Sequence, residues 1–310
     1  MLVKRQFTPV SMWPYVRFDL ALALVASVVA WLLVAVLGVA QVELPSTLAV
    51  VLGTALSILL AVRVNTAYQR WWEASGTWAQ MVGFSRTLLR VVVAVTSAKP
   101  DADPEAITRF RHDIARRQVA YLTALRLQLR GQLDSAEGRA ELATRLADTG
   151  DADLADADSP AMLLLARQSQ RIIAAFGEGV LTGFDNFQME FALAGVSTQQ
   201  ALAERTAMQP MPRTYDVLSR YLLHLYVVVF PFAVIGSLPR DQWLIIPAAL
   251  IAAYAFRMIE RIGSLDTPFG NTTHDVPITA IATIVERDLL TVTGVAERPA
   301  APQPVDGYLW

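Results

Sequence analysis

Four long apolar segments limit what this chain can fold into more than any other feature of its sequence. From Leu20 to Ala40 no charged residue occurs, and about 20 apolar residues suffice for a helix that crosses a bilayer. Three further apolar segments are shorter, and the last fits best as the return arm of a helical hairpin. We therefore expect four membrane helices, at about residues 18–40, 44–62, 219–238 and 242–257.

The composition indicates a membrane protein that also has a water-soluble part. Hydrophobic residues make up 54% of the 310 residues and charged residues 17%, whereas a soluble domain averages roughly 45–50% and about 25%. The first apolar segment also resembles a signal peptide, because Lys4 and Arg5 precede it and small residues end it. The core of a signal peptide has only about 7–15 residues, so the longer run favours a retained membrane helix.

Positive charges predict the orientation of the four helices. Arginine and lysine residues precede the first and third segments and follow the second and fourth: Lys4, Arg5, Arg17, Arg63, Arg70, Arg86, Arg90, Arg213, Arg220, Arg257 and Arg261. The connections at the opposite ends, residues 41–43 and 239–241, are short. Because cytoplasmic loops carry the excess of Lys and Arg, we expect both termini and the middle section in the cytoplasm.

The cytosolic part is expected to be helical, at about residues 63–215 and 258–298, so the fold class is all-α. Asp103-Pro104-Glu105 is typical of a helix start, and an apolar face near 3.6 spacing follows it. Arg111, Arg116, Arg117, Arg126 and Arg130 are interpreted as a solvated helix face. We expect one domain over residues 1–298 and a Pro-rich, disordered or docked tail at 299–310.

The acidic stretch from Gly131 to Pro160 is interpreted as a solvated connection between helices. It contains five closely spaced aspartates, but a calcium loop that started at Asp151 would need Gly and Glu where Asp156 and Met162 stand. This stretch therefore does not predict an EF-hand.

Several functional classes are disfavoured by what the sequence contains. The net charge of −2 argues against a nucleic-acid partner. Without cysteine there are no disulfides or thiolate metal sites, and the three histidines lie too far apart in sequence for a zinc motif. No set of residues supplies an acid, a base and a nucleophile, so we expect no enzyme, no metal and no cofactor.

The second apolar segment is the natural candidate for a pore lining. Thr54, Ile58 and Val62 are spaced i, i+4, i+8, so they share one helix face. Around a symmetry axis they would form stacked rings, and apolar rings gate a pore by dewetting. The alternative is that this face packs against a neighbouring helix, because small residues such as Gly53 often mark close helix contacts.

A polar and aromatic segment follows directly, with the pattern Arg63-x-Asn65-x-Ala67-Tyr68-x-Arg70-Trp71-Trp72-Glu73-Ala74. The tryptophans could anchor at the membrane interface, where aromatic residues concentrate, or pack beneath the preceding helix. Further along, Thr267-Pro268-Phe269-Gly270 is followed by Asp275-x-Pro277. Within the third segment His224 is interpreted as a packing residue rather than a proton relay.

These motifs, in this order, resemble the bestrophin family of ion channels and its bacterial branch in particular. Residues 115–126, Glu204-Arg205 and Pro210 to Tyr215 also resemble the family, and the likeness covers about residues 5–290. The resemblance implies a homopentamer in the inner membrane with one central pore and a wider cytosolic cavity. It places a narrow neck at Thr54, Ile58 and Val62, the triplet that the helical spacing also selects.

The resemblance implies further expectations about conduction. The second constriction is expected at Leu193 or a near neighbour within Phe187–Ala194. The permeating ions would be small and monovalent, with anions such as chloride favoured and sodium or potassium as the alternative. The partners would be further copies of the same chain, membrane lipid and the permeating ions. The alternative of another class is a membrane-anchored helical scaffold whose cytosolic helices bind a partner.

Two departures from the family pattern concern the neck and calcium. Relatives with an aromatic neck carry Phe, where this chain has Thr, Ile and Val. Animal members place an acidic run after Pro-Phe-Gly to bind calcium, where this chain has Asn271-Thr272-Thr273-His274-Asp275. Calcium prefers six to eight oxygen ligands, so the sequence predicts that calcium is not required.

Overall fold

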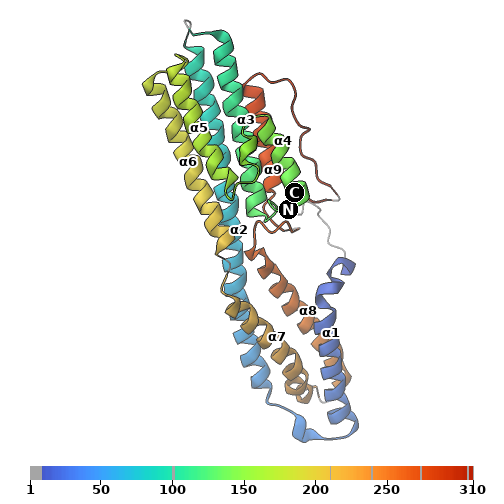
Figure 1. The fold of residues 1–310 in the computed structure, drawn as a ribbon. Coiled ribbons are helices and arrows are strands. Elements are labelled where there is room, and N and C mark those ends of the chain that lie inside the picture. Colours follow the sequence, from blue (N-terminus) through green and yellow to red (C-terminus); the bar gives the residue numbers. More distant parts are fainter. Residues whose placement is uncertain are drawn as a thin grey trace. The chain divides into compact units, whose positions relative to one another are not determined.

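The computed structural model describes residues 9–99, 102–209, 211–238, 240–272, 274–305 and 307–309. Lys4, Arg5, Pro210 and Thr273, which entered the predictions above, lie outside these residues. Within the described ranges the regular structure is helical, apart from one isolated bridge between Val305 and Tyr308 (Figure 1). The predicted all-α class with four membrane helices is therefore confirmed.

The chain divides into two compact units. The membrane unit holds the described residues within Lys4–Arg70 and Pro210–Thr267, and the cytosolic unit holds those within Trp71–Gln209 and Pro268–Trp310. Helix α2 (Ser46–Ser97) supplies residues to both units. Each unit is described separately below.

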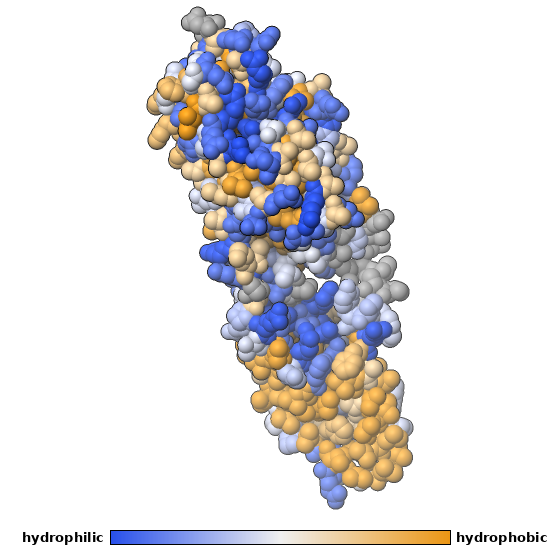
Figure 2. All heavy atoms as spheres, viewed as in Figure 1, coloured by the Kyte–Doolittle hydropathy of each residue, from blue (hydrophilic) through white to orange (hydrophobic). Residues whose placement is uncertain are grey.

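The membrane unit is built from α1 (Pro9–Trp31), the first half of α2, α7 (Arg213–Val234) and α8 (Ile245–Ile262). A short π-helix, Leu32–Val36, extends α1, and the 3₁₀ turns Ala40–Val42, Ile235–Ser237, Gln242–Leu244 and Gly263–Asp266 end or join the helices. In the part of the chain that the structure describes, four helices are long and apolar enough to cross a membrane. On the face that Figure 2 shows, hydrophobic residues make up much of this unit's surface. Their outward apolar side chains suit a lipid solvent.

Helix α1 begins about nine residues earlier than predicted, at Pro9 rather than near residue 18. The prediction followed hydropathy, which drops where charged and polar residues start. A helix can nevertheless continue past the lipid, because its backbone hydrogen bonds do not depend on side-chain polarity. Arg17 consequently lies inside α1 rather than before it.

The membrane unit has a small core of its own. Leu56 and Leu60 of α2 are buried with Leu223, Tyr226 and Val227 of α7. A Cβ atom at Gly53 would lie 3.1 Å from the Tyr226 ring, so glycine lets this ring approach the α2 backbone. Close packing through a small residue is how membrane helices associate.

The cytosolic unit packs the second half of α2 with α3 (Pro104–Leu129), α4 (Ala136–Ala147), α5 (Pro160–Gly177), α6 (Gly183–Met208) and α9 (Ile278–Val292), and the 3₁₀ turn Ala152–Leu154 lies between α4 and α5. Its core includes fully buried Trp78, Phe110 and Tyr121. A Cβ atom at Gly195 of α6 would lie 2.3 Å from the Phe84 ring, so only glycine admits the aromatic ring there.

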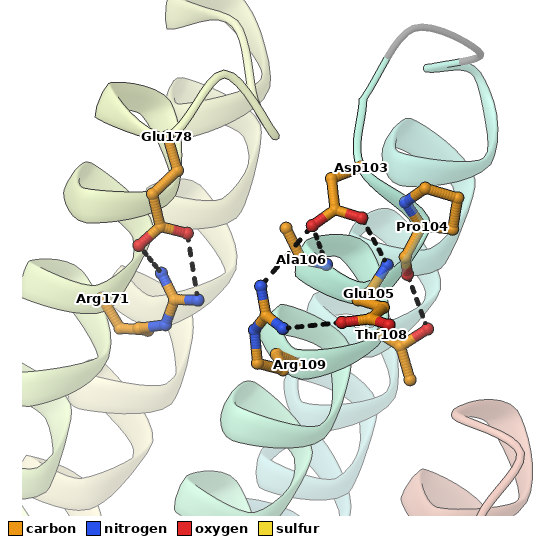
Figure 3. Close-up of polar contacts among 8 residues, drawn as sticks. All are labelled: Asp103, Pro104, Glu105, Ala106, Thr108, Arg109, Arg171 and Glu178. Carbon is orange, nitrogen blue, oxygen red and sulfur yellow. Dashed lines mark hydrogen bonds and ion pairs between the residues drawn. The ribbon is translucent and has the colours of Figure 1, made fainter.

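The start of α3 follows the sequence prediction. Asp103 accepts hydrogen bonds from the backbone N–H groups of Glu105 and Ala106, and Pro104 occupies the first turn (Figure 3). On the neighbouring α5, Arg171 donates to both carboxylate oxygens of Glu178 (Figure 3). The cap satisfies backbone donors that an unprotected helix start would leave unpaired.

The acidic stretch is not simply a solvated connection. It contains α4, which starts at a Ser135 cap and buries Leu142 and Leu146 one turn apart. Arg117 is largely buried and donates to Asp151 at 2.6 Å, while Arg126 pairs with Glu141 at 2.5 Å. The prediction of a solvated face is therefore wrong for Arg117 and Arg126, because acids from this stretch fold back as their partners.

Candidate pore-lining site

The predicted neck triplet faces away from the protomer's own core. Ile58 is 62% exposed and Val62 51%, and Thr54 is also exposed. Leu56 and Leu60, on the other side of α2, are almost fully buried against the rest of the membrane unit. Among the described residues of the membrane unit, no helix packs over the triplet, so packing inside this unit does not account for this face of α2.

Polar side chains along this part of α2 bond to the helix backbone. Thr54 Oγ1 donates to the carbonyl of Val50 at 2.7 Å, Ser57 Oγ to Gly53 at 2.7 Å and Thr66 Oγ1 to Val62 at 2.9 Å. Each hydroxyl proton is therefore used inside the helix. In the stripe formed by Thr54, Ile58 and Val62, the Thr54 hydroxyl can therefore accept a hydrogen bond from its surroundings, but its proton is already donated within the helix.

Arg63, the residue after Val62, is buried and joins three helices. Its guanidinium lies 2.5 Å from Asp216 of α7 and 2.7 Å from Glu260 of α8. A Cβ atom at Gly263 would lie 2.9 Å from Arg63 Nε, so the glycine leaves room for the side chain. We call Arg63 with Asp216 and Glu260 the Arg63 clamp. It fixes α2 against α7 and α8 at the residue that follows the neck triplet in the sequence.

The charged contacts continue from Glu260 to the first helix. Arg257 lies 2.7 Å from Glu260 and 3.2 Å from buried Asp19, and His224 Nε2 lies 3.2 Å from Asp19 Oδ1. The His224 ring also meets the Phe18 ring edge-on. Sequence reasoning missed Asp19, Asp216 and Glu260. The available signal was an acid at the edge of each apolar segment, where an unpaired charge would be costly.

The remaining residues of the polar segment fall into two groups. Asn65, Tyr68, Trp72 and Glu73 are exposed, and Glu73 makes a long ion pair of 3.8 Å with Arg205. Arg70 Nε donates to the carbonyl of Asp266, within the membrane unit, at 3.0 Å. Trp71 Nε1 donates to the carbonyl of His274, within the cytosolic unit, at 3.0 Å. Arg70 and Trp71 thus bind backbone of the segment that follows α8.

The carboxyl group of Asp266 lies in the segment that follows α8 and is partly buried. Partial burial and the Asp216 carboxylate raise its pKa, against the opposing effect of Arg63 and Arg70. Burial is the largest cause of this shift, because it disfavours the charged form of the carboxyl group.

The Pro268-Phe269-Gly270 segment forms a closed loop in the cytosolic unit. Phe269 is buried, and Val276 N–H donates to the Pro268 carbonyl at 3.0 Å. Asp275 is also buried and accepts hydrogen bonds from the backbone N–H and the hydroxyl of Thr272. Burial and Arg126 lower the pKa of Arg130 to about 10, while Asp275 acts in the opposite direction. Asp275 therefore already has a donor partner and a nearby cation.

We expect that calcium does not activate this protein. The described residues contain no group of three His, Asp or Glu side chains that could hold a metal ion, and Asp275 is occupied by Thr272. Currents measured in planar bilayers should differ by less than tenfold between micromolar calcium and a calcium chelator. A tenfold or larger increase on adding calcium would contradict the prediction, and magnesium at the same concentration is the control.

Leu193, the predicted second constriction, is only 4% exposed and belongs to the core of the cytosolic unit. A residue that lines a pore has to face out of its protomer. Within the predicted window, Phe187 and Phe191 on the same helix are 73% and 70% exposed. The burial of Leu193 does not fit the expected role, and the two phenylalanines fit it better.

Comparison with known proteins identifies relatives along most of the chain. The family model for bacterial and fungal bestrophin proteins matches residues 11–291. The voltage-dependent anion channel-forming protein YneE of Escherichia coli (strain K12) is 30% identical over 260 residues, which cover 83% of this chain and 80% of that protein. A protein of the same description from Synechocystis sp. is 27% identical and covers 80% of this chain and 77% of its own length.

Solved structures share the fold. A bacterial bestrophin homologue from Klebsiella pneumoniae aligns with a TM-score of 0.77 at 24% identity, covering 91% of this chain and 99% of that one. The four membrane helices, the order of the motifs and the family match over residues 11–291 agree with one another. The chain belongs to the bacterial and fungal bestrophin family.

Proposed function

We propose that the protein is a homopentameric channel that passes small monovalent ions, with anions such as chloride favoured. Five copies of the stripe Thr54, Ile58 and Val62 would form the neck, and residues 1–298 would form the channel protomer. The observation that carries the proposal is the outward exposure of this stripe on a membrane helix whose opposite side is buried. Relatives named as anion channel-forming proteins support the choice of anions.

The proposed neck is apolar and uncharged. Such a neck gates by dewetting and does not by itself choose the sign of the ion. Sodium or potassium conduction through the same architecture is therefore the second candidate. A second constriction is proposed within Phe187–Ala194 of α6, at Phe187 and Phe191, because both side chains face out of the cytosolic unit. Both termini are proposed to lie in the cytoplasm, on the side where arginine residues cluster.

The test has two measurements. Mass determination in detergent should give five copies, and a monomer or a variable oligomer would favour the scaffold alternative. Purified protein in planar bilayers should conduct, and the reversal potential in asymmetric potassium chloride should lie toward the chloride equilibrium potential. A reversal potential on the potassium side would establish the cation alternative. A pentamer without conductance under any ionic condition would contradict the channel proposal.

A further inference from the structure

A pocket on the first turns of α7 is not explained by conduction. Its volume is about 370 Å³, and its lining consists of Arg213, Asp216, Val217, Arg220, Tyr221 and His224. At about 100° per residue, Arg213, Arg220 and His224 fall within about 40° of one another around the helix. The two arginines and His224 thus share one face of α7.

Among the described residues, the two arginines of this pocket have no charged partner. Neither the Arg213 nor the Arg220 side chain makes a hydrogen bond or ion pair with any residue that the structure describes, and both are exposed. The acid in the pocket, Asp216, is already held by Arg63 at 2.5 Å. His224 lies against Asp19. The pocket therefore presents two unneutralised guanidinium groups, which prefer a phosphate or carboxylate.

The place of the pocket in the sequence limits what can fill it. Arg213 is the first residue of the third membrane helix, which runs from Arg213 to Ser237 when the 3₁₀ turn after α7 is included. The pocket therefore lies at one end of a membrane helix. Tyr221 is highly exposed beside it, and tyrosine concentrates at the level of lipid headgroups. Exposed Leu225 and Val228 continue along α7 into the apolar part of the span. The surface thus combines two cations, an aromatic side chain and an apolar track.

We propose that this pocket binds the headgroup phosphate of an anionic phospholipid, whose acyl chains lie along Leu225 and Val228. Basic pockets at membrane helices on the cytoplasmic side recognise anionic headgroups. A free phosphate would use the arginines but leave the apolar track without a partner. A zwitterionic lipid carries its own cation beside the phosphate, so it would gain less from two unpaired arginines.

The experiment is native mass spectrometry of the purified full-length protein with phosphatidylglycerol and phosphatidylcholine of identical acyl chains. Phosphatidylglycerol adducts should persist at lower lipid concentration. The double variant Arg213→Gln/Arg220→Gln should weaken phosphatidylglycerol binding about tenfold or more, since each arginine near an anionic surface contributes to affinity. The matched control is Arg240→Gln, an exposed arginine at the other end of the α7–α8 hairpin that lies outside the pocket, and it should leave binding unchanged.

A second variant covers the case in which the double variant is poorly folded. Val217→Asp places a carboxylate in the pocket at an exposed position, and it should also weaken phosphatidylglycerol binding while phosphatidylcholine binding stays the same. Equal binding of the two lipids to the unmodified protein would overturn the proposal. Displacement of phosphatidylglycerol by millimolar inorganic phosphate would assign the pocket to free phosphate, and unchanged lipid binding in both variants would place the lipid elsewhere. None of these results depends on conductance, so the channel proposal is tested separately.

Discussion

Replacing Arg63 with alanine is expected to destabilise the membrane unit by about 3 kcal/mol, because removing one partner of a buried ion pair leaves uncompensated charge. Arg63 is only 6% exposed, and Glu260 on α8 is equally buried. Glu260 keeps its contact with Arg257, which limits the loss, whereas Asp216 is left without an ion-pair partner among the residues that the structure describes. For a protein of this size the melting temperature in detergent should fall by roughly 5–10 °C.

The measurement is thermal unfolding followed by intrinsic tryptophan fluorescence. Arg86→Ala is the matched control, because Arg86 pairs with Asp288 at the exposed surface, where such a pair contributes about 1 kcal/mol or less. Gly263→Ala should act in the same direction as Arg63→Ala, since its Cβ atom would approach Arg63 Nε to 2.9 Å. Equal melting temperatures for Arg63→Ala and Arg86→Ala would show that the buried contacts do not stabilise the helices.

Replacing Ile58 with aspartate is expected to change ion selectivity more than any other single substitution. Ile58 is exposed at the middle of the proposed neck, so a pentamer would gain a ring of five carboxylates there. Rings of acidic side chains favour cations and repel anions. In asymmetric potassium chloride the reversal potential should therefore move toward the potassium equilibrium potential.

The control for this substitution is Ile58→Asn, which has nearly the same shape as the aspartate and no charge. It should raise the conductance by making the neck easier to wet, with little change in reversal potential. Ile58 is exposed and does not belong to the membrane unit's core as the structure describes it, so folding should survive both changes. If Ile58→Asp leaves conductance and reversal potential unchanged, the stripe does not line the conduction path.

Sequence reasoning succeeded where the information is local. The Asp103 cap and the four apolar segments each depend on residues within a few turns of one another. Periodicity and capping rules describe that range of the chain. The outward exposure of Ile58 and Val62 then agrees with the face that their spacing selects.

The features that were missed depend on partners far apart in the chain. Arg63 and Glu260 are 197 residues apart, and no spacing rule links an arginine to an acid at that distance. Arg117 was assigned to solvent because its partner, Asp151, lies in a stretch whose many aspartates indicated a loop. Leu193 and Phe191 are two residues apart, and only the packing of α6 decides which one is buried.

The Arg63 clamp limits how the proposed neck can change its width. Turning α2 about its own axis would carry Val62 and Arg63 together, because they are consecutive residues of one rigid helix. Such a rotation would separate Arg63 from Asp216 and Glu260 at the same time, so α2 is torsionally locked beneath the neck. Widening the neck by rotating α2 about its own axis in each protomer is therefore energetically unfavourable. Widening would instead require side-chain rotamer changes, or an outward tilt in which α2, α7 and α8 move as one piece.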